Sequence, residues 1–254
     1  MQDLLIKLDK LKILFNERFP RKTWSWEDKE QLKINLTYYS NNIEGNVISY
    51  GDTVSYLKHG IQAGQPIKDL TELKNHKKIL DRIFELYDLN ELKEEDIKSL
   101  HYELMEDPVL WPEGIDSVQG AGMYREDRRY GIREGGVNAY KEYLIPVEVA
   151  GAMKKLLEDF NRKLNGEIHP VQLAAEFHYQ FLNVIHPFYD GNGRVARVIA
   201  NLHLINKGYI PLVIKNKLHY INSLIESEKN SSADPLTKLF ANILIEDMEI
   251  KLKS

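Results

Sequence analysis

A break between two helical sequence patterns gathers residue types that can handle phosphate groups. The segment from His186 to Arg197 reads HPFYDGNGRVAR. Pro187 ends the preceding helix, which places His186 at that helix's C-terminal end as a candidate general base. Asp190 offers a hard oxygen ligand, and one carboxylate together with phosphate oxygens is a common way to hold Mg²⁺. The stretch therefore indicates phosphoryl or nucleotidyl transfer, in which positioning and charge neutralisation do most of the work.

The residues that follow this carboxylate are suited to binding anions. Gly191, Asn192 and Gly193 tolerate backbone conformations with positive φ and lead directly into the next helix. Successive backbone N–H groups there would form a concave anion nest, strengthened by the helix N-terminus. Arg194 and Arg197 are three residues apart, so we expect both to project from one side of the first turn as guanidinium clamps.

Each of these features alone has a simpler explanation. A single histidine near an apolar helix end is usually structural, and a stretch rich in glycine and asparagine is usually a turn. Arginine pairs on helices are mostly solvated or salt-bridged. Only their coincidence within one short segment favours a functional site.

The segment resembles the signature of the Fic family, which is His-Pro-Phe-x-Asp/Glu-Gly-Asn-Gly-Arg with a second arginine three residues later. Every fixed position is matched. The surrounding order agrees, since a Gly-x-x-Arg element runs from Gly122 to Arg125 ahead of a predicted hairpin. The likeness covers most of the chain and is strongest from about residue 95 to 208. It implies a protein adenylyltransferase of the type that carries an N-terminal inhibitory helix.

The resemblance implies a role for each polar residue of the segment. His186 would be the general base that deprotonates the acceptor hydroxyl, and Asp190 would hold Mg²⁺. The stretch from Gly191 to Gly193 would cradle the α- and β-phosphates of ATP, and Arg194 would bind the same region. Arg197 would bind the γ-phosphate.

The resemblance also indicates which residues contact the nucleotide base and which group is transferred. Tyr220 lies in a region similar to the family's adenine-contacting tyrosine, and Asn230 would line the base pocket. Relatives that transfer phosphate have a lysine where this chain has Gly193, so the glycine matches the adenylylating pattern. A few relatives use UTP or other donors, and ATP is the default expectation.

The segment from Gly120 to Pro146 is the one long stretch without a sustained helical period. Its run AYKEYLI suits a short hairpin, which we expect at roughly residues 137–145. By the resemblance this hairpin would be a flap that docks the target segment by strand addition, through Tyr140, Lys141 and Glu142.

A second motif lies near the end of a predicted helix and reads SNNIEGN from Ser40. Gly45 is well placed to terminate the helix, which leaves Glu44 in the last turn. The helix dipole makes that position unfavourable by about 0.3–1 kcal/mol, so Glu44 is either solvated or faced by a cation. The motif, with Ser40, Glu44 and Gly45, resembles the family's inhibitory motif. In such relatives the glutamate pairs with the second signature arginine, here Arg197, and displaces the γ-phosphate.

Apolar residues at helical spacing recur along almost the whole chain. They predict an all-α fold, a helical bundle around two central helices, with one small β-hairpin flap over the active site. We expect an N-terminal helical region at 1–90 with the inhibitory helix at about 27–44, a Fic core at 91–210, and a C-terminal helical extension at 211–254. Other helices are expected within residues 67–88, from Pro146 to residue 163, and from Asp234 onward.

Composition narrows the class of protein. With 254 residues, 43% of them hydrophobic, the chain can bury a substantial core. A net charge of −4 argues against a general nucleic-acid binder, so we expect no DNA partner, and the absence of cysteine excludes disulfides and thiolate chemistry. The N-terminal segment is too charged for a secretory signal, and no apolar run approaches membrane length. We therefore expect a cytoplasmic protein with no membrane partner.

Several polar residues are given no catalytic role. His178 lies on an apolar stripe and is expected in the core. No zinc-ligand spacing is present among the other histidines, which are His59, His76, His101, His169, His203 and His219. A basic cluster could guide ATP or an acidic target, or could be a solvated loop; it comprises Arg125, Arg128, Arg129 and Arg133.

The sequence thus predicts a Mg²⁺-dependent enzyme that transfers AMP from ATP to a Ser, Thr or Tyr hydroxyl of a protein, with Glu44 as its inhibitor. Two alternatives stay open: hydrolytic removal of AMP at the same site, and a non-enzymatic nucleotide-sensing or protein-binding module. The target protein is unknown, and both self-modification and a homo-oligomer stay open.

Overall fold

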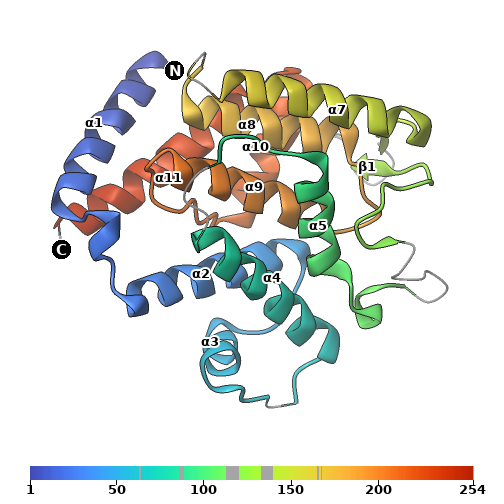
Figure 1. Ribbon diagram of the computed structural model, residues 1–254, viewed down its shortest axis with the longest axis horizontal. Helices are drawn as coiled ribbons and strands as arrows, with labels where there is room; N and C mark the ends of the chain where they lie inside the picture. Colours follow the sequence, from blue (N-terminus) through green and yellow to red (C-terminus); the bar gives the residue numbers. More distant parts are fainter. Residues whose placement is uncertain are drawn as a thin grey trace.

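The computed structural model describes residues 1–62, 64–85, 89–112, 120–132, 140–164, 166 and 168–253. Helices dominate these residues (Figure 1), which confirms the predicted helical bundle with one small hairpin. The helices are α1 (Gln2–Arg18), α2 (Trp26–Glu44), α3 (Tyr50–His59), α4 (Ile67–Glu85), α5 (Glu94–Met105), α7 (Pro146–Lys163), α8 (Pro170–Tyr179), α9 (Asn192–Asn206), α10 (Lys217–Lys229) and α11 (Asp234–Lys253). The shorter elements are 3₁₀ turns at Arg21–Thr23 and Pro108–Leu110, a π-helix at Gln180–Ile185, and strands β1 (Tyr130–Ile132) and β2 (Tyr140–Glu142).

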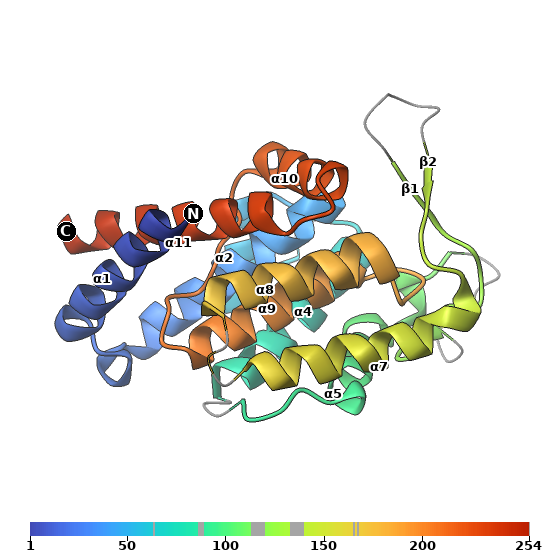
Figure 2. The ribbon, with the colours of Figure 1, turned by 90° about the horizontal axis from the view of Figure 1, so that it is seen from above.

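Helices α8 and α9 form the centre of the bundle (Figure 2). Helix α7 packs along one side of this pair, α10 and α11 lie on another, and α2 and α4 pack against α9. Every residue of α9 from Asn192 to Ile205 is buried. A helix that is covered on all faces belongs to the core of its protein, so the part of the HPFYDGNGRVAR segment that opens α9 is enclosed by the rest of the chain.

Two clusters of buried apolar side chains hold the bundle together, and both include α9. One joins α5, α7 and α8 to α9 and contains Phe160 and Phe177. The other joins α1, α10 and α11 to α8 and α9 and contains Leu8, Leu204 and Phe240. Because α1 packs on α11 near the two ends of the chain (Figure 1), the N-terminal and C-terminal regions share a core with the central helices.

Helix α2 has defined signals at both ends. At its start the Ser25 hydroxyl accepts the backbone N–H of Asp28, and the Asp28 carboxylate accepts the Ser25 N–H in return. At its end Gly45 adopts a left-handed conformation with φ of 103° and closes the last turn onto the carbonyls of Asn41 and Asn42. The predicted end of the helix at Glu44 is therefore confirmed.

Other predicted boundaries hold as well. Helix α7 begins at Pro146, where the missing N–H of proline costs nothing, and ends at Lys163. Helix α11 begins at Asp234, and α4 occupies Ile67–Glu85 within the predicted range.

The hairpin differs from its predicted position. Residues 137–139 lie outside the described part of the chain, and β2 lies inside the predicted 137–145 range. Its antiparallel partner β1 is upstream of that range, with Tyr130 opposite Glu142 and Gly131 opposite Lys141. A glycine inside a strand weakens the β pattern, so Gly131 accounts for the failure to predict β1.

Within the described residues, no helix combines the length and the apolar character that crossing a membrane requires.

A substitution of Gly45, compared with one of a helical glycine, tests the geometry that ends α2. Gly45→Ala should destabilise the protein by about 1–2 kcal/mol, because an L-residue resists the left-handed backbone although a methyl group would meet no atom there. Gly151→Ala, on the exposed side of α7, also meets no atom but should stabilise by about 0.5–1 kcal/mol through helix propensity. Urea unfolding measures both, and a shift of the same sign in the two variants would contradict the assignment.

Candidate active site

His186 follows the π-helix and adopts a left-handed conformation with φ of 50°, which is unusual for a residue other than glycine. Its Nδ1 lies 3.0 Å from the carbonyl oxygen of Leu182. A carbonyl only accepts hydrogen bonds, so Nδ1 carries the proton and Nε2 keeps its lone pair. Burial lowers the pKa of His186 to about 4, so the ring is neutral near pH 7. Tyr143 stacks on the ring at 4.0 Å. The structure thus presents a neutral imidazole with Nε2 as its basic atom.

Arg125 holds the strained backbone around His186. Its guanidinium donates to the carbonyls of His186 at 2.6 Å, Ile185 at 3.2 Å and Asp127 at 2.7 Å, and also to Leu144. The bonds to Ile185 and His186 satisfy carbonyls that the end of the π-helix leaves without intrahelical partners, and the other two tie in the chain on either side of the hairpin. The sequence left open whether the basic cluster guides an anion or is a solvated loop. Arg125 does neither, because it is buried and its donors are bonded to backbone carbonyls.

The loop between His186 and α9 is closed by its own side chains. Asn192 accepts the N–H of Phe188 at 2.9 Å and donates to the carbonyl of the same residue at 2.8 Å. Gly191 turns the chain with φ of 75°. The N–H groups of the first turn of α9 have no intrahelical acceptor, so they form the anion-binding end of the helix. The Asn192 side chain faces the loop, which leaves the backbone N–H groups for the predicted nest, and anion binding there stays a prediction.

Glu44 reaches this anion-binding end from the C-terminus of α2. Its Oε1 lies 2.6 Å from Nη2 of Arg197, whose Nε donates to the Ser40 hydroxyl at 2.9 Å and whose Nη2 also donates to the Ser40 carbonyl at 2.9 Å. A methyl group at Gly193 would overlap the Glu44 carboxylate, so glycine is needed for this approach. Burial acts to lower the pKa of Arg197, but Glu44 and Tyr220 outweigh it and hold that pKa above its ordinary value. The predicted pair of Glu44 and Arg197 is present in the structure.

Arg194 is also tied to the N-terminal region, through a residue that the sequence analysis missed. Its side chain is 2% exposed and lies 3.3 Å from the Glu72 carboxylate of α4 and 3.7 Å from that of Asp190. Glu72 is held in turn by the Asn46 amide at 2.9 Å. Instead of projecting together as open clamps, both signature arginines are buried against carboxylates from helices α2 and α4. Glu72 could have been noticed as a charged residue among apolar neighbours of a predicted helix, since a buried charge needs a partner.

His101 is a second residue whose contribution the sequence did not reveal. Its Nδ1 accepts the N–H of Gly122 at 2.8 Å, so its Nε2 carries the proton that it donates to the Asp190 carbonyl at 3.0 Å. The ring also stacks on Phe188 at 3.8 Å. His101 thereby links the Gly-x-x-Arg element to the catalytic loop. Its place within an apolar helical stripe was the available signal.

Asp190 directs its carboxylate outward, and its side chain is 51% exposed. One oxygen accepts the adjacent N–H of Gly191 at 2.6 Å. No cluster of three or more His, Cys, Asp or Glu side chains suited to a metal ion occurs among the described residues. This position suits a cation that brings most of its ligands with it, as Mg²⁺ bound to phosphates does.

Tyr220 occupies a different place from the one expected of an adenine contact. The residue is 1% exposed, and its hydroxyl lies 2.7 Å from Nε2 of His178 and 3.4 Å from Nη1 of Arg197. It therefore supports Arg197 from the buried side and offers no open ring face in this structure. His178 is a hydrogen-bonded core residue, as the sequence predicted. Asn230 is exposed at the end of α10.

The hairpin contacts helix α10. Lys141 of β2 pairs with Glu228 of α10 at 3.2 Å, and Arg128 pairs with Glu142. The backbone of Tyr140 belongs to β2, and its side chain lies outside the described part of the structure.

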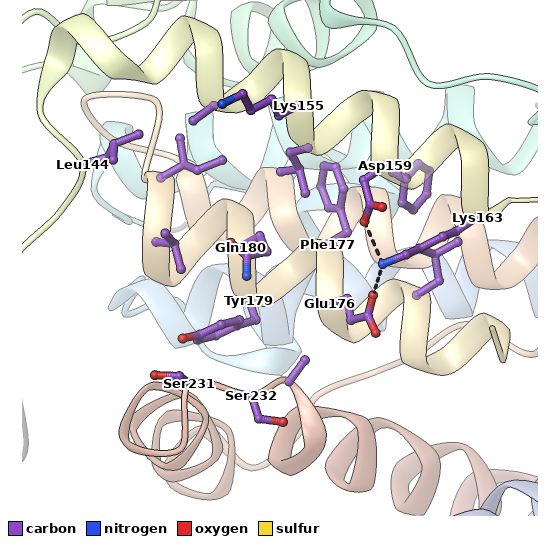
Figure 3. A pocket seen from close by; sticks show the side chains of 17 residues that line it. Leu144, Lys155, Asp159, Lys163, Glu176, Phe177, Tyr179, Gln180, Ser231 and Ser232 are labelled. Carbon is purple, nitrogen blue, oxygen red and sulfur yellow. Dashed lines mark hydrogen bonds and ion pairs between the residues drawn. The ribbon is translucent and has the colours of Figure 1, made fainter. Parts of the chain in front are cut away.

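A separate cleft of about 550 Å³ lies over α8, between α7 and the turn that joins α10 to α11 (Figure 3). Lys163 bridges Asp159 at 2.7 Å and Glu176 at 2.9 Å along its wall. The cleft includes neither His186 nor the signature arginines, so we do not assign the chemistry to it.

The chain resembles known proteins both in sequence and in structure. Residues 91–204 match the model of the Fic/DOC family. The chain is 30% identical to a protein adenylyltransferase Fic of Drosophila erecta over 197 residues, which are 73% of this chain and 35% of that protein. This chain thus spans about a third of the length of the curated relatives that it matches.

Solved structures agree over nearly the full chain. A Fic domain-containing signaling protein from Bacteroides thetaiotaomicron superposes with a TM-score of 0.81 at 27% identity, covering 97% of this chain and 96% of that one. Fic-1 from C. elegans superposes with a TM-score of 0.79 at 23% identity, covering 99% and 71% of the two chains.

Replacing Arg125 tests its structural role. Arg125→Gln should destabilise the protein by about 3 kcal/mol, because several buried carbonyls lose their charged donor. Arg128→Gln changes an exposed neighbour on the same segment and should stay within about 0.5 kcal/mol of the parent. Urea denaturation of both variants measures the difference, and an Arg125 variant as stable as the parent would rule out this role.

Proposed function

This chain contains a domain of the Fic/DOC family at residues 91–204, and on that premise we propose that the protein transfers AMP from ATP to a hydroxyl group of another protein. The observation that carries the proposal is the arrangement around α9. A neutral histidine, protonated on Nδ1, lies beside the start of α9, where the guanidinium of Arg197 binds the Glu44 carboxylate and the buried guanidinium of Arg194 lies against Glu72. Transfer of a phosphate group requires a base and positive charge positioned in this way.

In the proposed reaction Nε2 of His186 accepts the proton of the acceptor hydroxyl. The hydroxyl oxygen bonds to the α-phosphorus of ATP, the bond from that phosphorus to the bridging oxygen of the β-phosphate breaks, and pyrophosphate leaves. The bond from Nδ1 to the Leu182 carbonyl fixes the tautomer and stabilises the imidazolium that forms.

The phosphates of ATP would bind at the N-terminal turn of α9. Its backbone N–H groups and the guanidinium of Arg197 match the charge of a triphosphate. Gly193 leaves room above the first turn, because the space that a side chain would fill is now taken by the Glu44 carboxylate. A phosphate group and this carboxylate would therefore use the same place.

The outward carboxylate of Asp190 would bind Mg²⁺ that arrives with the nucleotide. The ion would supply charge neutralisation for the phosphates when bound. Asp190 is fixed for this purpose by the bond from His101 to its carbonyl.

Glu44 would act as an inhibitor built into the chain. Arg197 cannot pair with this carboxylate and with the γ-phosphate at the same time. While Glu44 is in place, ATP would bind with its α-phosphate out of line for attack.

Hydrolytic removal of AMP is a second candidate, favoured by one observation. The Glu44 side chain is 35% exposed, so one side of the carboxylate faces the site and could orient a water molecule. The two directions require opposite things of Glu44, since transfer needs it displaced and removal needs it in place.

Substitution of Glu44 separates these roles. Glu44→Gly should raise transfer of labelled AMP to protein by about 100-fold, because the α-phosphate can then align and a displacement near 1 Å costs that much in rate. Arg197→Ala should stay inactive, and the double variant should resemble Arg197→Ala, as expected of direct partners.

Labelled ATP, cell lysate and detection of modified protein by mass spectrometry provide the measurement, with Glu44→Gln as the matched variant that keeps size and loses charge. If Glu44→Gly is no more active than the parent but loses the removal of AMP from a modified protein, hydrolysis is the function of the site.

The pKa of His186 gives a pH dependence. The neutral ring is the active form, so kcat/KM of Glu44→Gly should be flat from about pH 8 to 6 and should fall only below about pH 5, because burial lowers this pKa to about 4. An ordinary histidine would give half of the maximal value near pH 6.5. The rate of His186→Ala, measured in parallel, gives the background. An acidic limb centred near pH 6.5 would refute the assigned base or its environment.

A further inference from the structure

The two faces of the hairpin carry different residues. In the register of β1 and β2, Tyr130 lies opposite Glu142, and the N–H of Tyr143 donates to the carbonyl of Arg129 at 3.0 Å, which extends the same register by one pair. Residues directly opposite each other in an antiparallel pair point to the same face. Arg129 and Tyr143 therefore share one face, and the stacking of Tyr143 on His186 shows that this face covers the active site.

Arg129 lies against the catalytic loop. The centre of its guanidinium is 3.4 Å from the centroid of the Tyr189 ring, and Tyr189 directly precedes Asp190. Its Nε is buried and has no hydrogen-bond partner among the described residues. A buried donor without a partner is rare, because it loses its bonds to water without replacement. The guanidinium of Arg129 thus lies against the Tyr189 ring, and its Nε is a hydrogen-bond donor without an acceptor in the described part of the chain.

The other cations in the described part of the hairpin segment are already paired. Lys141 is bound to Glu228, Arg128 to Glu142 on the opposite face, and Arg125 to backbone carbonyls. Among the described residues no carboxylate lies within ion-pair distance of Arg129. Arg125 is close enough that the positive charge of Arg129, added to burial, lowers its pKa. This corner of the site therefore attracts an anion that the described chain does not supply.

We propose that Arg129 binds a carboxylate of the acceptor protein and so selects acidic segments for modification. The proposal rests on the proposed transfer to a protein hydroxyl. A planar guanidinium held by an aromatic ring presents a fork of donors that fits a carboxylate. The contacts of Arg129 are Tyr189 and the hairpin, whereas those of Arg197 are Ser40, Glu44 and Tyr220, so the anion bound by Arg129 is separate from the nucleotide phosphates.

The hairpin also sets the spacing. An acceptor segment aligned with the hairpin as an added strand would point alternate side chains toward the active-site face. The hydroxyl that reaches His186 and the carboxylate that reaches Arg129 must both lie on that face. They are therefore separated by an even number of positions in the acceptor, and two is the shortest such spacing.

Fluorescein-labelled peptides with one threonine test this preference. One carries Glu two residues from the threonine, a second carries Gln there, and a third carries Glu at the adjacent position. Anisotropy titrations without nucleotide should show the first peptide binding Glu44→Gly protein about tenfold more tightly than the other two. The added substitution Arg129→Gln should remove the difference, Arg129→Lys should keep part of it, and Arg128→Gln on the outer face should keep all of it. Thermal unfolding and ATP titrations verify that each variant is folded.

Equal affinity for the first two peptides, no measurable binding of the acidic peptide, or a preference that persists in Arg129→Gln would overturn the proposal. Weaker ATP binding in Arg129→Gln, with the peptide preference unchanged, would assign Arg129 to the nucleotide instead. AMP transfer to the same peptides is measured separately. A binding preference without any transfer would support the acidic selectivity and would remove the proposed reaction.

Discussion

The charge of Arg197 is buried in the second turn of the central helix α9, and this constraint shapes the surrounding structure. A buried guanidinium is stable only when its donors and its charge are matched. The matching groups come from distant parts of the chain, since Ser40 and Glu44 lie on α2 and Tyr220 lies on α10. Helix α2 is therefore joined to the candidate active site by polar bonds as well as by apolar packing. The proposed inhibition and the packing of α2 thus involve the same side chain.

Three buried arginines near His186 are satisfied in three ways, and the differences have functional meaning. Arg125 is bound by backbone carbonyls, which cannot leave without unfolding the loop. Arg194 faces Glu72, which is itself buried and held by Asn46. Arg197 faces Glu44, whose side chain is 35% exposed and can rotate toward solvent. The first two arrangements keep the catalytic loop and the start of α9 in place. The third is the one that an incoming anion could replace.

The sequence allowed the fold class, the end of α2 at Gly45, the start of α7 at Pro146 and the contact of Glu44 with Arg197 to be predicted. These features depend on local rules or on a contiguous motif. The contributions of Arg125, His101 and Glu72 depend on contacts between residues far apart in the chain, and their types alone suggested exposed or unremarkable positions. Tyr220 was misplaced for the same reason, because only packing shows that its hydroxyl turns inward to His178. Strand β1 was missed because Gly131 hides its pattern.

The meeting of the C-terminus of α2 with the N-terminus of α9 has a consequence for how an inhibitor of this kind responds to its surroundings. Glu44 is attached to the same chain as the site it occupies, so its effective concentration there is set by geometry and does not fall when the protein is diluted. In the proposed mechanism a free nucleotide would compete against this constant local concentration. The balance between them would then depend on the nucleotide level and on anything that moves α2 relative to α9, whereas the abundance of the protein would leave it unchanged.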